Sequence, residues 1–354
     1  MLSDDTISKF ENAWSNQPLP KEHGLVITDM VTAMDDGRIK SMYVVGENPL
    51  LSEPDLTHAE AAFKKLDFLV VQDIFLHETA QIADVVLPAT TFAEKDGTFT
   101  NSERRVQRVR KVIEPVGDSR PDWTIIGELG RRISDKLGLE VEHEFDYSHP
   151  SEIFDELSGL TPIMGGITYD RLEQEGGIQW PCPTSDHPGT RYLYESDFPR
   201  GPKAKFVAFD QGPAADEVPT ERFPLILNTG RILYHWHGGT ITRRASNLMA
   251  RSPELELAIN AEDAQKYGID DGDWVRVRSR RGDMEARALF SDKQAPGELF
   301  VPFAKLQEHA ANYLTNPALD PTSRIPEYKV CAVRVDKLVN GEGVSDGRRR
   351  RVRV

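Results

Sequence analysis

The stretch SMYVVGENPLLSEPDLTHAEAAFKKLDFLVVQD, residues 41–73, holds the pattern that decides the fold. It begins with the short apolar run Ser41–Val45 and ends with a second run at residues 68–71. Between them, apolar residues recur at three- and four-residue spacing from Ala59 to Leu66, which is the spacing of an amphipathic helix. Apolar runs that alternate with helical spacing predict parallel strands whose sheet has both faces covered. A third run at 85–87 extends the pattern, so we predict an α/β domain.

Polar or turn-forming residues follow each predicted strand. They are Gly46, Glu47 and Asn48 after the first run, Gln72 and Asp73 after the second, and residues 88–91 after the third. In open α/β sheets, ligands bind in the crevice outside the carboxyl ends of the strands. These three loops are therefore the predicted rim of a binding site.

The second half of the chain has a different pattern, which begins near Phe223. Short apolar strands at 225–227, 255–259, 274–277, 285–290 and 298–301 are separated by Gly- and Asp-rich turns, with one helix at 261–267. Short strands with such turns predict a small barrel. We divide the chain at these changes of pattern into an α/β domain (1–138), a crossing segment (139–218), a barrel (219–338) and a basic tail (339–354).

A strong helix is predicted to follow Pro121. Its apolar residues form one stripe: Trp123, Ile126, Leu129, Ile133 and Leu137. Asp122 stands at a natural N-cap position, so it is either a cap or a functional carboxylate. The Pro- and Gly-rich residues from about 140 to 218 predict irregular surface connections, and the arginine-rich end at 347–354 predicts a disordered terminus or a docking tail.

The composition limits the function. The 354 residues carry a net charge of −14, which argues against non-specific nucleic-acid binding, and they include only two cysteines, Cys182 and Cys331. No disulfide framework and no all-cysteine cluster is expected within this chain. The sequence has no apolar run of eighteen residues and no signal-peptide pattern, so a cytoplasmic location without a membrane span is expected.

The densest functional stretch is TGRILYHWHGGTITRR, residues 229–244. His235 and His237 could ligate a metal, but no Cys, Asp or Glu within ten residues of His237 completes a set, and no nucleophile for acid–base chemistry stands nearby. An anion cradle fits better, because Arg231 offers a planar fork for phosphate and the glycines permit a close backbone approach. The rings of His235, Trp236 and His237 could stack on a flat heterocycle. A purely structural loop remains the alternative.

Several ordered blocks resemble one known family. They are residues 43–49, 71–75 with 77–80, 83–88, 94–105, 229–244, 268–273 and 326–333. On these blocks, the chain resembles the C-terminal part of the molybdopterin oxidoreductase family, most closely the formate dehydrogenase alpha subunits. The resemblance implies a Rossmann-like parallel sheet domain followed by a double-psi-like β-barrel that binds molybdopterin dinucleotide. It also implies a bis(molybdopterin guanine dinucleotide) cofactor with molybdenum or tungsten.

The same resemblance implies a set of cofactor-binding residues and no catalytic or metal-ligating residue in this chain. The set is Gly46, Glu47, Asn48, Gln72, Asp73, Lys95, Asp122, Thr229, Gly230, Arg231, Ile232, Leu233, Tyr234, His235, Trp236, His237, Gly238, Asn312 and Lys329. A carboxylate can accept both N–H groups of guanine's Watson–Crick edge, so Asp73 or Asp122 could read that base. Cys331 matches a family cysteine without a metal role.

The chain departs from the family pattern in one respect. Family members carry cysteines that hold an iron–sulfur cluster, and a Cys or selenocysteine beside a histidine at the metal, and none of these is found here. We therefore expect a truncated product or one half of a split subunit, inactive alone, whose partner carries the cluster and the active-site half. An electron-transfer subunit is a further expected partner. The alternatives are a nitrate-reductase-like relative and a non-catalytic cofactor-binding or assembly protein.

Overall fold

The computed structural model describes residues 3–14, 18–139, 145–195, 198, 201–212 and 215–338. They belong to two compact units that are interleaved along the chain. The first unit comprises residues 1–24, 72–74 and 86–210, and the second comprises 25–71, 75–85 and 211–354. The domain boundaries drawn from the sequence at 138 and 218 remain predictions. The basic tail, 339–354, lies outside the described residues.

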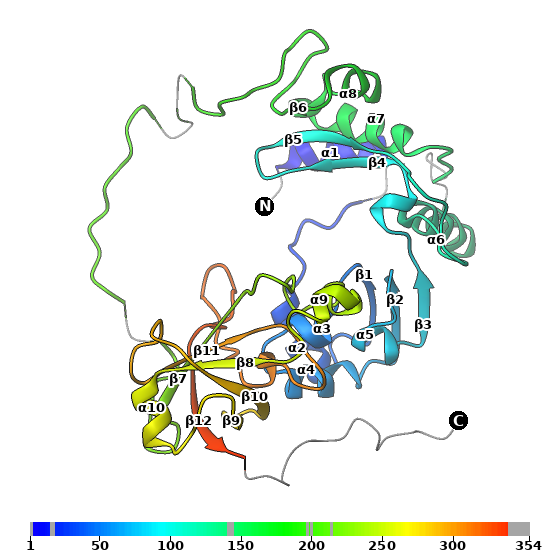
Figure 1. The fold of residues 1–354 in the computed structure, drawn as a ribbon. Coiled ribbons are helices and arrows are strands. Elements are labelled where there is room, and N and C mark those ends of the chain that lie inside the picture. Colours follow the sequence, from blue (N-terminus) through cyan, green and yellow to red (C-terminus); the bar gives the residue numbers. More distant parts are fainter. Residues whose placement is uncertain are drawn as a thin grey trace. The chain divides into compact units, whose positions relative to one another are not determined.

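The predicted parallel sheet is confirmed (Figure 1). Its strands are β1 (Ser41–Val45), β2 (Phe68–Asp73) and β3 (Val85–Pro88), in the order β1-β2-β3. The helices of this region are α2 (Ile27–Asp35), α3 (Pro49–Ser52), α4 (Leu56–Phe63) and α5 (Glu78–Gln81). The side chain of Asp55 caps α4 by accepting from the amide of His58 at 3.3 Å, which explains why the helix begins there.

Helices α2 and α4 cover one face of this sheet. Val44 of β1 and Leu69 and Val71 of β2 are buried in one cluster with residues of both helices, among them Met34 and Phe63. Successive side chains of a strand point to opposite faces, so the neighbours of these residues lie on the other face. On that other face Tyr43, Val45 and Phe68 are partly exposed, whereas Gln72 is fully buried.

The first unit has an antiparallel sheet and its own helices. The strands are β4 (Gly97–Thr100), β5 (Arg105–Val109) and β6 (Ile178–Gln179), and the helices are α1 (Asp4–Ala13), α6 (Asp122–Leu137), α7 (Pro150–Leu160) and α8 (Tyr169–Glu175), with 3-10 turns η1 (Phe92–Glu94) and η2 (Pro162–Met164). The expectation of an irregular segment over 139–218 is wrong for residues 150–182. Phe154 of α7, Leu172 of α8 and Cys182 pack with Val106 of β5 in one buried cluster.

Helix α6 is confirmed, but its predicted cap and its apolar stripe are not. The N-cap residue is Pro121, and Asp122 is the first residue of the helix, with no capping bond from either side chain. Of the stripe, Ile126, Ile133 and Leu137 are 46%, 53% and 66% exposed. The helix buries Ile125 instead, together with small residues at positions 127 and 134, so it packs through a narrow face.

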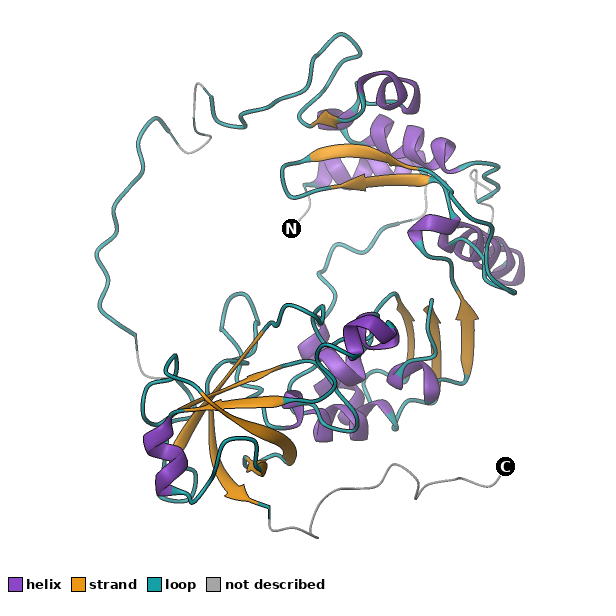
Figure 2. Cartoon of the chain, viewed as in Figure 1, coloured by secondary structure: helices purple, strands orange, loops and turns teal. Residues whose placement is uncertain are grey.

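The predicted barrel is confirmed as a closed six-stranded barrel (Figure 2). Its strands are β7 (Leu225–Gly230), β8 (Glu256–Ile259), β9 (Trp274–Arg278), β10 (Asp283–Phe290), β11 (Glu298–Pro302) and β12 (Cys331–Lys337), in the order β10-β8-β11-β7-β12-β9. The pairs β10–β8 and β11–β7 are parallel and the other pairs are antiparallel. The connections contain η3 (Thr242–Arg244), α9 (Ser246–Met249), α10 (Ala261–Lys266) and η4 (Ala311–Tyr313).

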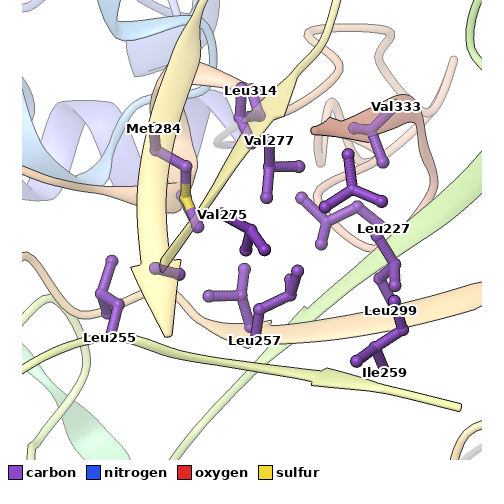
Figure 3. Packing of buried hydrophobic residues seen from close by; sticks show 14 of the residues in the cluster. Leu227, Leu255, Leu257, Ile259, Val275, Val277, Met284, Leu299, Leu314 and Val333 are labelled. Carbon is purple, nitrogen blue, oxygen red and sulfur yellow. The ribbon is translucent and has the colours of Figure 1, made fainter. Parts of the chain in front are cut away.

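The barrel is filled by aliphatic side chains, as Figure 3 shows. Leu227, Leu257, Val277 and Leu299 come from four different strands, and each is fully buried. In a small barrel the inward-facing side chains of the strands fill the interior in this way. In the part of the chain that the structure describes, none of the helices combines the length and apolar character that a bilayer crossing needs.

Candidate functional site

Three predicted site residues form one cluster in the first unit. The side-chain amide of Gln72, which is fully buried at the end of β2, donates to Oδ1 of Asp122 at 2.7 Å. Lys95 forms an ion pair with Oδ2 of the same carboxylate, and its ammonium also donates to the carbonyl of Thr90 at 3.2 Å. The sequence predicted that Asp122 is either a helix cap or a functional carboxylate. In the structure its carboxylate binds the side chains of Gln72 and Lys95 and caps no helix. The side chains of Lys95 and Asp122 retain 24% and 31% exposure, so a ligand can reach them.

The same unit contains a site residue that the sequence reasoning did not single out. Thr90 is 2% exposed, and its hydroxyl has no hydrogen-bond partner among the described residues. Thr90 could have been found from its position, because it lies in the loop after β3, which the sequence analysis predicted to be part of the binding rim. Asp73 lies at the end of β2, where its carbonyl accepts from the amide of Ala89 at 3.1 Å.

In the second unit, the loop after β1 is held by Asn48. Its amide group donates to Oε2 of Glu78 at 2.9 Å and to Oγ1 of Thr240 at 3.1 Å, while its carbonyl oxygen accepts from the hydroxyl of Thr79 at 2.8 Å. Asn48 is buried, so its polar atoms serve the protein itself. Gly46 and Glu47 are exposed, and Gly46 has φ +66° with open space where a Cβ would lie.

Glu78, at the start of α5, connects this loop to the barrel. Both of its carboxylate oxygens accept from Nη2 of Arg243 at 2.8 Å, and Oε1 lies 3.1 Å from the ammonium of Lys305. Burial alone would raise the pKa of Glu78, but hydrogen bonds from Arg243 and Asn48 and the charge of Lys305 outweigh it and hold the pKa far below its usual range. One carboxylate thus balances two cations whose side chains are 15% and 14% exposed.

The beginning of the 229–244 stretch belongs to the barrel rather than to a loop. Thr229 and Gly230 are the last residues of β7. The hydroxyl of Thr229 donates to the carbonyl of Tyr328 at 2.8 Å, and the ammonium of Lys329 donates to the carbonyl of Thr229 at 3.1 Å. A Cβ on Gly230 would lie 2.7 Å from the ring of Phe300. Packing against this ring explains the glycine, so the predicted close approach of a ligand is not needed to account for it.

His235 serves the structure of the loop. It is 2% exposed, its Nδ1 lies 3.2 Å from the hydroxyl of Thr242, and its Nε2 lies 2.8 Å from the carbonyl of Ser252. Both ring nitrogens are therefore occupied within the loop. Gly238 is likewise structural, because a Cβ there would lie 2.7 Å from the side chain of Leu51.

The remaining residues of the stretch form an exposed surface, which we call the loop face. Nη2 of Arg231 donates to Nε2 of His237 at 3.0 Å, and the ring of His237 stacks on that of Trp236 with centroids 4.8 Å apart. Trp236 and Leu233 are 67% and 87% exposed, Tyr234 is exposed, and Ile232 is half-buried. The loop face thus presents a guanidinium beside stacked flat rings, the groups that a phosphorylated heterocycle would contact.

Two buried acceptors, Asn312 of η4 and Glu53, lie where η4 contacts the C-terminal end of α3. The side-chain amide of Asn312 donates to the carbonyl oxygens of Leu51, Ser52 and Glu53 at 3.0–3.1 Å, whereas its own Oδ1 has no partner among the described residues. The carboxylate oxygen Oε2 of Glu53 is buried and also without a described partner. Burial and the neighbouring charge of Glu47 raise the pKa of Glu53 to about 7. Sequence reasoning found Asn312 but not Glu53.

These groups fit a large cofactor that has phosphates and a donor-rich heterocycle. The loop face offers a cation and rings, and Asn312 and Glu53 offer acceptors that a ligand's N–H groups would satisfy. Within the described residues, no group of three or more His, Cys, Asp or Glu side chains is arranged to hold a metal ion, and neither histidine of the loop belongs to one. Cys182 and Cys331 are both buried and free, and burial raises the pKa of the Cys331 thiol to about 11.

Comparison with known families gives two matches. Residues 15–132 match the molybdopterin oxidoreductase family, and residues 225–332 match the molydopterin dinucleotide binding domain. The first match covers β1 to β3 and the Gln72, Lys95 and Asp122 cluster, and the second covers the barrel from β7 to the start of β12, with the loop face and Asn312.

Individual relatives agree with these matches. The chain is 44% identical to the F420-dependent formate dehydrogenase 2 subunit alpha of Methanococcus maripaludis, over 94% of this chain and 48% of the relative. It is also 44% identical to the F420-dependent formate dehydrogenase subunit alpha of Methanocaldococcus jannaschii, over 95% of this chain and 48% of the relative. The chain thus spans about half the length of these relatives. Acetylene hydratase from Pelobacter acetylenicus shares the fold, with a TM-score of 0.67 at 19% identity over 88% of this chain and 46% of the other.

Proposed function

Because the chain belongs to the molybdopterin oxidoreductase family, we propose that it is the cofactor-binding half of a formate dehydrogenase alpha subunit. The whole enzyme would oxidise formate to carbon dioxide, a proton and two electrons. The observation that carries the proposal is the loop face, where Arg231, His237 and Trp236 are joined by a hydrogen bond and a ring stack and yet stay exposed. The names of the two relatives at 44% identity support formate as the substrate.

The proposed cofactor is bis(molybdopterin guanine dinucleotide) with molybdenum or tungsten. When bound, it supplies the two-electron chemistry, and the protein supplies binding, orientation and electrostatics. In this proposal Arg231 holds a phosphate group, and the stacked rings of Trp236 and His237 lie against the pterin. Asn312 and Glu53 accept from N–H groups of the heterocycles through the oxygens that have no described protein partner. Asp122 accepts from guanine, with Gln72 and Lys95 fixing its carboxylate.

The other half of the enzyme is proposed to come from polypeptide outside these 354 residues. The only two cysteines, Cys182 and Cys331, are buried, so an iron–sulfur cluster is proposed to be held by that other polypeptide. The chain alone is then expected to bind cofactor weakly and to have no formate dehydrogenase activity. A cytoplasmic location is proposed from the sequence, and an electron-transfer subunit is the proposed further partner. Formate oxidation by the isolated, cofactor-loaded chain would contradict this division of roles.

The experiment that tests the cofactor assignment is Arg231→Ala, with Arg222→Ala as the matched exposed control. Both proteins are purified with any chain that accompanies them, and their pterin and metal contents are measured. Loss of a charge-assisted hydrogen bond costs about 1.5–3 kcal/mol, so Arg231→Ala should bind the cofactor roughly ten- to a hundred-fold more weakly. The Arg222→Ala protein should keep its content. Equal pterin content in Arg231→Ala and wild type would show that the loop face does not hold the cofactor.

A further inference from the structure

Glu53 is a buried carboxyl group that lacks a hydrogen-bond donor. It follows the short helix α3 and is 5% exposed, and its oxygen Oε2 has no partner among the described residues. Asn312 and Tyr328, which lie against this end of α3, belong to the same compact unit. The arrangement around Glu53 is therefore internal to the second unit.

The donor groups around Glu53 bind other acceptors. The side-chain amide of Asn312 donates to three carbonyl oxygens at the end of α3. The hydroxyl of Tyr328 donates to one of these carbonyls, that of Ser52, at 2.9 Å. The backbone N–H of Glu53 donates to the carbonyl of Pro49 at 3.0 Å. None of these donors is left for Oε2 of Glu53.

The titratable groups that face Glu53 do not compensate a carboxylate either. Glu47, in the loop after β1, repels a negative charge on Glu53. Burial and the charge of Glu53 raise the pKa of the Tyr328 phenol, so Tyr328 stays neutral. Burial and the repulsion by Glu47 raise the pKa of Glu53 to about 7. Because an uncompensated charge is costly to bury, Glu53 keeps its proton below about pH 7.

We infer that Glu53 exchanges its proton for hydrogen bonds from the cofactor's N–H groups, which are the donors that the protein does not supply. The O–H bond of Glu53 breaks, its proton passes to the solvent, and both electrons of that bond stay on the carboxylate. A carboxylate can accept two N–H groups at once, and these charge-assisted bonds hold the negative charge. Binding of the cofactor is thereby coupled to pH. The identity of the ligand rests on the proposed function.

The sign of this coupling follows from proton linkage. Below about pH 7 the free site holds a proton that the occupied site has lost, so the affinity for the cofactor rises with pH. Release of a single proton limits this rise to about tenfold per pH unit. Above about pH 7 the free site has already lost its proton, and the affinity no longer depends on Glu53.

The inference is tested by measuring the dissociation constant of the cofactor at pH 6, 7 and 8. Wild type, Glu53→Gln and the control Glu298→Gln, at an exposed glutamate of β11, are purified with any chain that accompanies them, and bound and free pterin are measured after equilibrium dialysis. Wild type and Glu298→Gln should bind about tenfold more weakly at pH 6 than at pH 8. Glu53→Gln, which has no proton to release, should change less than twofold. The same pH dependence in Glu53→Gln as in wild type would overturn the inference.

A second measurement needs only the wild-type protein. Calorimetric titration with the cofactor in two buffers of different ionisation enthalpy counts the protons released on binding. About one proton should be released at pH 6 and close to none at pH 8. Binding without proton release at pH 6 would contradict the inference and leave the cofactor assignment intact. Failure of the proposed function looks different, because it appears as a protein without pterin at any pH, which overturns both, or as full pterin content in Arg231→Ala.

Discussion

Replacing Glu53 with glutamine should make the stability of the chain less dependent on pH. Glu53 is 5% exposed, and its oxygen Oε2 has no hydrogen-bond partner among the described residues. Burial, together with the charge of Glu47, raises its pKa from 4.5 to about 7. The folded protein therefore holds the proton of Glu53 more tightly than the unfolded chain does.

The magnitude and its sign follow from proton linkage. One pKa unit corresponds to about 1.4 kcal/mol, so a rise from 4.5 to about 7 corresponds to about 3 kcal/mol. Below pH 4.5 both states are protonated, and the group has no effect on the free energy of unfolding. Between pH 4.5 and 7 only the unfolded chain releases the proton, so stability falls. Above pH 7 the full cost is present, and glutamine, which is isosteric and neutral, avoids it.

The assay is urea unfolding of wild type and Glu53→Gln at pH 4, 6 and 8. The difference in unfolding free energy between the two proteins should grow by about 3 kcal/mol in favour of the variant from pH 4 to pH 8. Glu298→Gln, at an exposed glutamate at the start of β11, is the matched control measured in the same way. A difference between Glu53→Gln and wild type that stays constant across this range would refute the reasoning.

Three further variants test the packing around the site. Glu78→Ala leaves Arg243 and Lys305 without their carboxylate and should lower the free energy of unfolding by about 3 kcal/mol, measured with urea at pH 7. Gly238→Ala brings a Cβ to 2.7 Å from the side chain of Leu51, so a loss of about 1–3 kcal/mol is expected in the same assay, and an unchanged midpoint would mean that Leu51 moves freely. Leu257→Ala removes a fully buried side chain of the barrel and should cost about 2–5 kcal/mol by thermal or urea unfolding.

The barrel and the parallel sheet were predictable because their sequence patterns are local. The short strands β9 and β10 with the Gly- and Asp-containing turns beside them, and the apolar runs of β1 and β2, are visible within a few consecutive residues of the sequence. The residues from 150 to 182 were misjudged because the prediction followed their prolines and glycines, whereas the periodic apolar residues of α7 and α8 determine their structure. For α6, the spacing of the apolar residues predicted the helix correctly. The same spacing did not show which face of the helix is buried.

The candidate site was predictable in its residue types but not in their partners. Histidine is a residue type that can ligate a metal or act as a base. Only the fold shows that Nε2 of His235 is hydrogen-bonded to the carbonyl of Ser252, seventeen residues away. Gly230 and Gly238 were assigned to a ligand's approach, and the structure explains both by side chains from other elements. Glu53 follows a short helix and carries no motif, so its burial could be known only from the structure.

The predicted site residues therefore divide into two groups with different consequences. Asn48, Thr229 and His235 are buried, and their polar atoms bind other parts of the protein, so their substitution would disturb stability and ligand binding together. Arg231 and Trp236 are exposed and make few contacts within the protein, so their substitution would change ligand binding at nearly constant stability. The buried residues hold the loop in one conformation before the ligand arrives. This lowers the entropic cost of ligand binding by the exposed residues Arg231 and Trp236. The stretch 229–244 is thus a rigid frame that carries a small exposed contact surface.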